Sequence, residues 1–300
     1  MTDTQDVSMA LGFTGHDTFA LRHGWLEKAY HEVRAAGPEN NPFKSDESII
    51  KFGVGKNMVN AIRHWALATH FIERCGEGYR TTSYADRIIT ELDPYFESPL
   101  ALWRVHYELA KDPANTTIYW IFSCLNSSSF SREFLERKLS DYAIENGKKA
   151  PASKTLKADI TVALAMYCRP KTRKSFSEDD ISNPLIELNL VSLNQDGTYS
   201  INVGAKKSLP DELVATAIHE FWQATDPRSS SIKLDTLLYT PGSPGRIFAL
   251  SESEMVDRLV RVATASKGMF DVSETAGVVQ IFKNQRKYDP RALAELWAQS

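Results

Sequence analysis

The sequence is short of cysteine, of net charge and of long hydrophobic runs, and each shortage excludes a class of protein. Its 300 residues include three isolated cysteines, Cys75, Cys124 and Cys168. An odd number of separate thiols argues against a disulfide framework and predicts a reducing, cytoplasmic environment. The formal net charge is −3, so any surface that binds nucleic acid has to be local.

No segment approaches the roughly 20 apolar residues of a membrane span, so we expect no membrane contact. The first residues lack a basic region followed by a long apolar run, so no signal peptide is predicted. The sequence shows no zinc-ligand spacing, no carboxylate cluster and no activated nucleophile. It therefore indicates no metal, no cofactor and no catalytic residue, and we predict a protein that is not an enzyme.

The stretch from 45 to 82 has the element order of a winged helix-turn-helix. A short apolar helix at 48–52 is followed by a glycine turn at 53–55. A longer helix then runs from 56 to about 72, and a hairpin with Gly76 and Gly78 in its turn follows. Such a module places its second helix in a nucleic-acid groove.

The second helix of this stretch is amphipathic. At 3.6 residues per turn, Met58, Ile62 and Trp65 fall on one side. Asparagine can pair with adenine, arginine can pair with guanine, and lysine neutralises phosphate. An ordinary solvated helix face would also be polar, and this alternative stays open. The residues predicted to face DNA are Lys56, Asn57, Asn60, Arg63 and His64.

A compact polar segment at 12–19 precedes a helix that we expect from about 18 to 35. A catalytic interpretation makes His16 a base and Asp17 its partner, but adjacent residues rarely orient one another in this way. Local geometry favours a turn in which Asp17 caps the helix. A further interpretation is a polar pocket for a ligand or phosphate, formed by Thr14, His16, Asp17, Arg22 and His23.

Helices expected at 83–92, 98–109 and 115–125 form a core that leads to a second module of the same order at 131–203. In this module Ser153 is the expected helix cap, and a hairpin turns at Asp196-Gly197.

Between 148 and 174 there are eight Lys or Arg residues and one acid, Asp159. A solvated loop cluster is the alternative to phosphate contact. The phosphate contacts that we predict are Arg80 in the first hairpin and Lys148, Lys149, Lys154, Thr155, Lys157, Lys171, Arg173 and Lys174 in the second module.

A third module is predicted at the end of the chain. A helix that follows a capping box of Ser251 and Glu254 is expected to occupy the recognition position. Acids in its first turns repel phosphate, so this module should dock protein. The predicted fold is mainly α with small β-hairpins (α+β), with tandem winged helix-turn-helix modules packed on a helical core. The expected domains are 1–97, 98–205 and 206–300.

Three blocks of the sequence resemble the bacterial family called domain of unknown function 4007. They read FTGHDTFALRHGWLEKA, KFGVGKNMVNAIRHWALATHFIE and DPYFESPLALWRVHYELA. The resemblance extends from about Phe13 to the end of the chain. It implies association with phosphoadenosine-phosphosulfate-reductase-like proteins and with DNA-sulfur-modification or phage-defence components. It supplies no catalytic residues.

The leading hypothesis is a cytoplasmic accessory or targeting subunit of a bacterial phage-defence or DNA phosphorothioation system. It would bind double-stranded DNA through its winged helices and would also bind a reductase-like or other defence-system protein. Two alternatives are an interaction scaffold for that partner and a transcriptional regulator of the defence operon. A nuclease or transferase centred on His16 and Asp17 would need chemistry that the sequence does not show.

Overall fold

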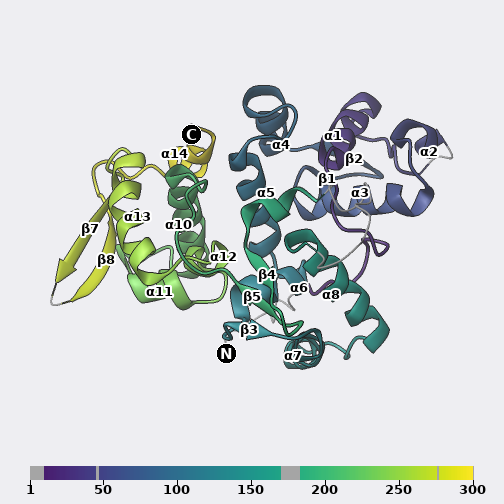
Figure 1. Ribbon diagram of the computed structural model, residues 1–300. Coiled ribbons are helices and arrows are strands. Elements are labelled where there is room, and N and C mark those ends of the chain that lie inside the picture. Colours follow the sequence, from purple (N-terminus) through teal and green to yellow (C-terminus); the bar gives the residue numbers. More distant parts are fainter. Residues whose placement is uncertain (1–9, 45–46, 170–182, 276, 300) are drawn as a thin grey trace, which may run out of the picture.

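The computed structural model describes residues 10–44, 47–169, 183–275 and 277–299. Helices and three small antiparallel sheets make up the fold (Figure 1), which confirms the expected α+β class. Within these residues no helix combines the length and the apolar character that crossing a bilayer would need.

The first part of the chain contains three helices and a hairpin. The helices are α1 (Trp25–Ala36), α2 (Glu47–Phe52) and α3 (Lys56–Ala68), and the hairpin pairs β1 (Ile72–Cys75) with β2 (Gly78–Thr81). The apolar side of α3 is buried as its periodicity predicts, and it includes Val59, Ile62, Trp65 and Ala66. This helix ends at Ala68, before the predicted end, because His70 turns the chain at a φ of 57°.

The start of α1 corrects one prediction. The helix begins at Trp25 after Gly24, and not near Thr18. Asp17 and Thr18 have φ values of 46° and 66°, in the left-handed region that no α-helix uses. Asp17 therefore does not cap α1, and the segment before Gly24 is free to cross the surface of α3.

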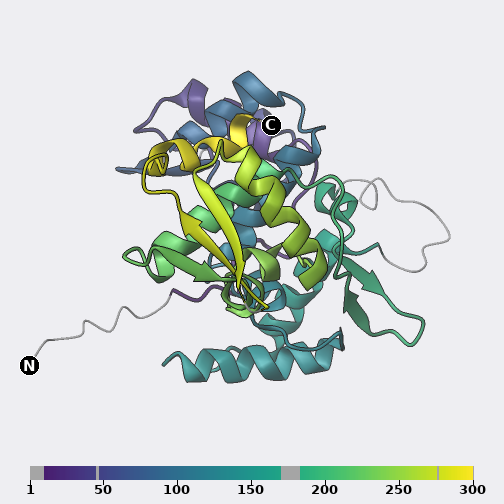
Figure 2. The same ribbon diagram turned by 90° about the vertical axis from the view of Figure 1, so that its left-hand side faces the viewer.

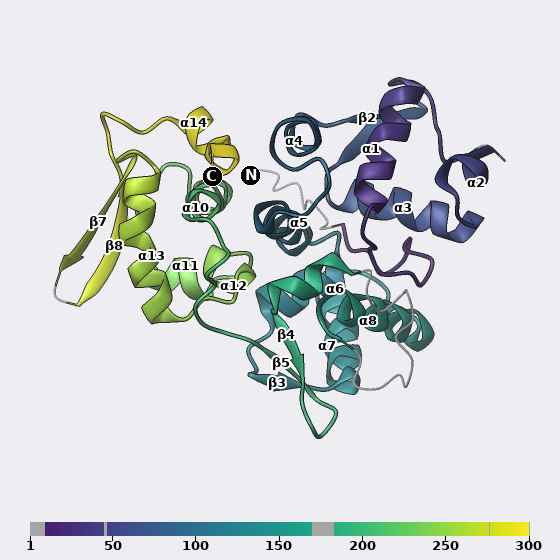
Figure 3. The ribbon, with the colours of Figure 1, turned by 45° about the horizontal axis from the view of Figure 1, so that its top comes forward.

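The middle of the chain is helical. It consists of α4 (Ser83–Arg87), the π-helical turn η1 (Ile88–Leu92), α5 (Pro99–Lys111), α6 (Thr116–Tyr119) and the π-helical turn η2 (Trp120–Cys124). The hydroxyl of Ser98 accepts a hydrogen bond from the backbone N–H of Leu100 and caps α5. Every residue of α5 from 100 to 110 is buried. A helix that is buried on all sides has other elements around it, and α5 lies between the three parts of the molecule (Figure 3).

The second part of the chain carries a three-stranded sheet. Its elements are β3 (Ser129–Phe130), α7 (Arg132–Glu145), α8 (Ser153–Tyr167), the 3-10 turn η3 (Pro184–Leu188), β4 (Val191–Leu193) and β5 (Tyr199–Ile201). The strand order is β3-β5-β4, so the first strand pairs with the last. Ser153 is the first residue of α8 and not its cap. The cap position is Ala152, which has no side chain to accept a hydrogen bond.

The third part repeats this strand order. Its elements are α10 (Asp211–Thr225), β6 (Ser231–Lys233), α11 (Leu234–Tyr239), α12 (Pro244–Ile247), α13 (Glu252–Ala265), β7 (Phe270–Thr275), β8 (Val278–Lys283), α14 (Pro290–Ala294) and η4 (Leu296–Gln299). The sheet order is β6-β8-β7. Ser251 caps α13 as predicted, with 3.3 Å between its Oγ and the backbone nitrogen of Glu254. The hairpin β7–β8 and the helix α7 both lie at the surface (Figure 2).

A buried ionic cluster on α5 joins this central helix to α4 and to the third part of the chain. Nη2 of Arg104 lies 2.6 Å from Oε1 of Glu108 and 3.4 Å from Oε1 of Glu220 on α10. Lys111 reaches the same two carboxylates at 3.0 and 2.8 Å. The guanidinium of Arg104 also faces three aromatic rings at 5.1–5.3 Å, those of Tyr84, Tyr107 and Trp297. Burial alone would lower the pKa of Arg104, but Glu108 and Glu220 outweigh it and hold that pKa above its ordinary value.

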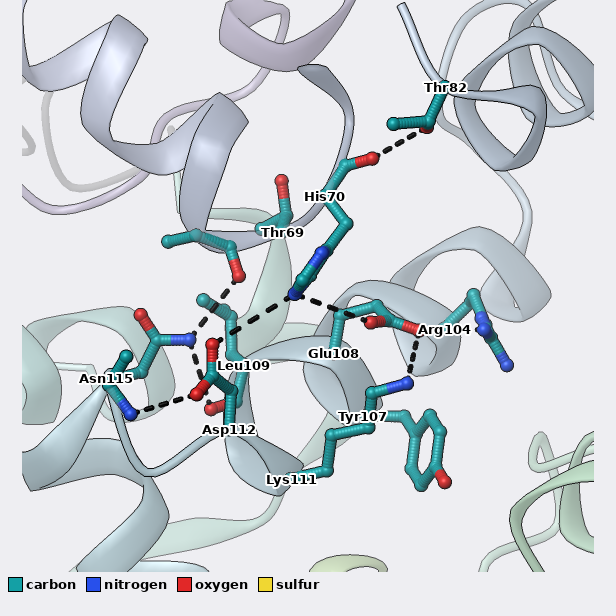
Figure 4. Close-up of polar contacts among 12 residues, drawn as sticks. Thr69, His70, Thr82, Arg104, Tyr107, Glu108, Leu109, Lys111, Asp112 and Asn115 are labelled. Atoms are coloured by element: carbon teal, nitrogen blue, oxygen red, sulfur yellow. Dashed lines mark hydrogen bonds and ion pairs between the residues drawn. The ribbon is translucent and has the colours of Figure 1, made fainter. Parts of the chain in front are cut away.

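The same cluster holds the end of α3 against α5 (Figure 4). Nε2 of His70 lies 4.0 Å from Glu108 and 3.9 Å from Asp112. The amide of Asn115 donates to the carbonyl of Ala68 at 3.2 Å. The first part of the chain is therefore tied to the central helix at the residue where α3 ends.

Replacing Arg104 with methionine should cost about 3–5 kcal/mol of stability, because the buried carboxylate of Glu108 would lose its closest cation. Urea denaturation followed by fluorescence measures this change. The matched control is Lys51→Met, which removes the exposed cation of the Lys51–Glu47 pair and should leave the transition almost unchanged. Equal midpoints for the two variants would contradict the organising role of Arg104.

Candidate functional site

The first turn of α3 is exposed, and the rest of its polar side is only partly exposed. Lys56 and Asn57 are exposed, whereas Asn60 and Arg63 are partly buried. Nδ2 of Asn60 donates to Oδ2 of Asp17 at 3.0 Å. The structure therefore leaves Lys56 and Asn57 accessible to solvent, and it uses Asn60 to hold the N-terminal segment.

His64 does not lie on the exposed side of α3, contrary to the prediction. A Cβ at Gly15 would stand 2.6 Å from Nδ1 of His64, so the N-terminal segment passes directly over this ring. The ring packs edge-on against Trp65, with a centroid distance of 4.8 Å. A helical projection of α3 alone cannot show this covering, because the residues that cause it precede α1.

His16 has a fixed partner, which is Asp159 and not Asp17. Its Nε2 lies 2.9 Å from Oδ1 of Asp159, which is 143 positions away in the sequence. Its Nδ1 accepts the backbone N–H of Thr18 at 3.1 Å, which leaves Nε2 to face Asp159. The hydroxyl of Thr117 donates to the other oxygen of Asp159. Because both ring nitrogens are engaged, this arrangement binds the segment to α8.

The five residues predicted to form one polar pocket are divided between different environments. Thr14 and His16 line a cavity of about 20 Å³, enough for about one water molecule and too small for a larger ligand. Asp17 binds Asn60, and His23 is exposed. Arg22 lies at a different, larger cleft.

That larger cleft has a volume of about 420 Å³ and lies between the N-terminal segment, α8, η3 and the β4–β5 hairpin. Three arginines line it, Arg22, Arg132 and Arg169. No aspartate or glutamate is among its lining residues within the described part of the chain. The prediction included Arg22 for a different pocket and did not include Arg132 or Arg169. Only Arg169 carried a sequence signal, since it begins the basic run after α8.

The predicted phosphate contacts on the second part are at the surface wherever the structure describes them. Lys148, Lys149, Lys154 and Lys157 are exposed, and Thr155 is partly buried. The only acid between 148 and 169, Asp159, is buried against His16, so it does not offset these charges at the surface. Lys157 lies 3.8 Å from Glu136.

Arg80 is more closely paired, because its Nε lies 2.6 Å from Glu73 across the β1–β2 hairpin. Lys171, Arg173 and Lys174 lie outside the described residues.

The covering of His64 predicts a dependence of stability on pH. Burial, with a smaller contribution from His16, lowers the pKa of His64 from 6.5 to about 4. The unfolded chain therefore binds a proton that the folded chain does not, and stability should fall as the pH drops from about 6.5 toward about 4. In urea denaturation at several pH values, His64→Gln should lose less stability over this range than the wild type. His31→Gln, at an exposed histidine, is the control, and identical pH profiles for His64→Gln and the wild type would contradict the assignment.

Three comparisons place the chain among known proteins. Two crystal structures resemble it closely, one of SspB and one of magnesium ion-bound SspB. The first has a TM-score of 0.83 and 26% identity, over 97% of this chain and 90% of that one. The second has a TM-score of 0.82 and 26% identity, over 99% and 92% of the two chains. The comparison with curated protein sequences gave no match.

The family comparison agrees with the resemblance found in the sequence. The family described as "Protein of unknown function (DUF4007)" matches residues 13–296, which is nearly the whole chain. The chain belongs to this family.

Proposed function

We propose that this protein is a cytoplasmic DNA-binding accessory subunit of a bacterial phage-defence or DNA phosphorothioation system. It binds double-stranded DNA through tandem winged helix-turn-helix modules and uses its third module to bind a protein partner. The association with defence and phosphorothioation rests on the resemblance that the sequence blocks carry. The DNA-binding role rests on the arrangement of helices, strands and charges described above.

Strand order supports the winged-helix assignment of the second and third parts. A winged helix has a first strand, two helices and a hairpin, and its first strand pairs with the last strand of the hairpin. The orders β3-β5-β4 and β6-β8-β7 both follow this rule. The first part has the helix, turn, helix and hairpin of the module, with two strands in its sheet.

The surface of α8 is the observation that carries the DNA-binding proposal. Residues three and four apart lie on one side of a helix, so Lys154, Lys157 and Thr161 form one row along α8. The two lysines are exposed, Lys157 lies 3.8 Å from Glu136 on α7, and the single acid of the segment itself is buried against His16. A row of exposed cations beside a buried acid suits the phosphate backbone of a duplex.

In the third part the arginines of α13 form ion pairs, unlike the exposed Lys154 of α8, and this supports a protein partner there. Arg258 of α13 is buried and pairs with Asp211 at 2.6 Å and with Glu254 at 2.9 Å. Arg261 pairs with the same two carboxylates. The cations of this helix are thus neutralised, while its Val260 is 64% exposed. An apolar exposed residue on a helix whose two cations are paired, and which also carries Glu252 and Asp257, fits a protein surface better than a phosphate backbone.

The magnesium ion bound in one similar structure favours a second candidate function, magnesium-dependent cleavage of the bound DNA. Magnesium is held by oxygen ligands in octahedral geometry, often by one or two carboxylates together with substrate phosphates. Among the residues that the structure describes, no group of three or more His, Cys, Asp or Glu side chains could hold a metal ion. These residues do not provide a complete protein site, and we assign no catalytic step to the metal.

Fluorescence anisotropy with labelled duplexes tests the DNA-binding proposal. The wild type should bind with an affinity that falls steeply as salt increases. The double variant Lys154→Glu/Lys157→Glu should bind more weakly, and its slope of log affinity against log salt should be smaller by about 1 for each lost phosphate contact. Lys233→Glu, an exposed lysine on β6, is the matched control and should retain wild-type affinity.

The result that would overturn the proposal is the absence of binding to any duplex at micromolar protein and low salt. Co-purification with a reductase-like partner, without affinity for DNA, would favour the scaffold alternative. Incubation of supercoiled plasmid with magnesium, and separately with a chelator, tests the second candidate, since only strand cleavage relaxes the plasmid.

A further inference from the structure

We infer that the cleft between the N-terminal segment and α8 binds a phosphate-bearing nucleotide unit. This inference deepens the proposed function, because it names a site for one nucleotide outside the row of lysines on α8. Binding of a nucleotide that belongs to a DNA strand rests on the proposed function. The same chemistry is present in a free nucleotide and in a nucleotide of a DNA strand that is unpaired or turned out of the stack. The experiment below separates these two sources.

The composition of the cleft matches a nucleotide better than a plain phosphate. Its volume of about 420 Å³ lies within the usual range of small-molecule sites, roughly 300–1,000 Å³. One part of its lining is apolar or aromatic and includes Phe19, Leu164, Ile186 and Leu193. The other part consists of arginines, hydroxyls and an amide. A base and sugar suit the first part, and a phosphate suits the second.

Arg132 is held ready to bind an anion. Its Nε and Nη2 donate to the hydroxyl of Tyr199 at 3.1 and 3.0 Å, and its Nη1 donates to the hydroxyl of Thr161 at 3.1 Å. A guanidinium has five N–H groups, so one remains on each terminal nitrogen. The guanidinium also lies over the ring of Tyr199, 5.7 Å from its centroid. Its orientation is fixed by neutral partners, and its positive charge is kept.

The hydroxyl of Tyr199 adds a hydrogen-bond donor beside Arg132, and the neighbouring carboxylate of Glu133 is bound elsewhere. The Tyr199 hydroxyl accepts two hydrogen bonds from Arg132, which leaves its own proton for an acceptor. The Thr161 hydroxyl donates to the carbonyl of Lys157 and so fixes the position of the next turn of α8. Glu133, the carboxylate next to Arg132 in sequence, binds its own backbone and Ser131 and does not line the cleft.

The walls of the cleft are anchored to the surface proposed to bind DNA. Thr18 and Phe19 belong to one wall, and the carbonyl of Phe19 accepts a 3.0 Å hydrogen bond from Nε1 of Trp65 on α3. Thr161, on the opposite wall, continues the row of Lys154 and Lys157 on α8. In Figure 3 the N-terminal segment runs between α3 and α8. A strand whose phosphates follow the lysine row would therefore reach the cleft one helical turn further along.

The first probe is a free nucleotide, thymidine 5′-monophosphate, measured by calorimetry against thymidine without phosphate. The second is a labelled duplex with one unpaired nucleotide, measured by anisotropy against the fully paired duplex. Both are measured with the wild type, Arg132→Gln and Arg137→Gln. Arg137 is the control, because it is an exposed arginine on the same helix and does not line the cleft. Tyr199→Phe is a second variant that removes the support of Arg132 and keeps the aromatic ring.

If the ligand is part of a DNA strand, the duplex with an unpaired nucleotide should bind more tightly than the paired duplex. Arg132→Gln should then reduce that affinity by about tenfold or more, since a charge-assisted hydrogen-bond pair is lost. If the ligand is a free nucleotide, the monophosphate should bind and thymidine should not, with a similar loss in Arg132→Gln. Tyr199→Phe should weaken the same binding, and Arg137→Gln should leave it unchanged.

The inference is overturned if neither probe distinguishes Arg132→Gln or Tyr199→Phe from Arg137→Gln in protein whose circular dichroism is unchanged. If duplex binding that depends on Lys154 and Lys157 is retained at the same time, only the inference about the cleft is refuted, and the DNA-binding proposal stands. A wild type that binds no duplex but binds the monophosphate through Arg132 would refute the DNA-binding proposal and support the cleft.

Discussion

The rest of the structure depends on the buried guanidinium of Arg104. A charge taken out of water is costly unless its partners surround it, and removal of a single partner leaves an uncompensated ion. The partners of Arg104 come from α5 itself, from α10 and from the aromatic residues Tyr84 and Trp297. The cluster is therefore complete only when α4 and the third part of the chain are both packed against the central helix. This requirement couples the packing of these elements to one another.

A second set of contacts, made by the N-terminal segment, fixes the surfaces that face the proposed DNA ligand. Asp159 of α8 accepts from His16 and Thr117, and Asn60 of α3 donates to Asp17, the residue after His16. The left-handed conformations of Asp17 and Thr18 cost about 1–2 kcal/mol each, and these contacts offset that cost. The N-terminal segment thus connects two helices that lie far apart in the sequence, and it also forms one wall of the arginine-lined cleft.

The sequence predicts what is encoded locally. Apolar periodicity located α3, the hydroxyl cap Ser251 was recognisable, and the Asp196-Gly197 turn marked a hairpin. The misses at His16, at His64 and at the start of α1 share one physical cause, which is contact between distant segments. A helical projection of α3 could not show that Gly15 covers His64, and no spacing rule connects His16 with Asp159. The start of α1 was placed too early, because the left-handed backbone of Asp17 and Thr18 depends on contacts with α3 and α8.

Local pairing of charges, and not their total, indicates where a polyanion would bind. The chain has 35 basic and 38 acidic residues, which would disfavour DNA if the charges were spread evenly. In the third part Arg258 and Arg261 are each paired with both Asp211 and Glu254, so both cations of α13 are neutralised. In the second part Arg132 is oriented by hydroxyls, and the acid among the lysines is buried. Hydroxyl groups fix the direction of a guanidinium without cancelling its charge, so the arginines of the two parts differ in their net electrostatic environment although the elements follow the same order.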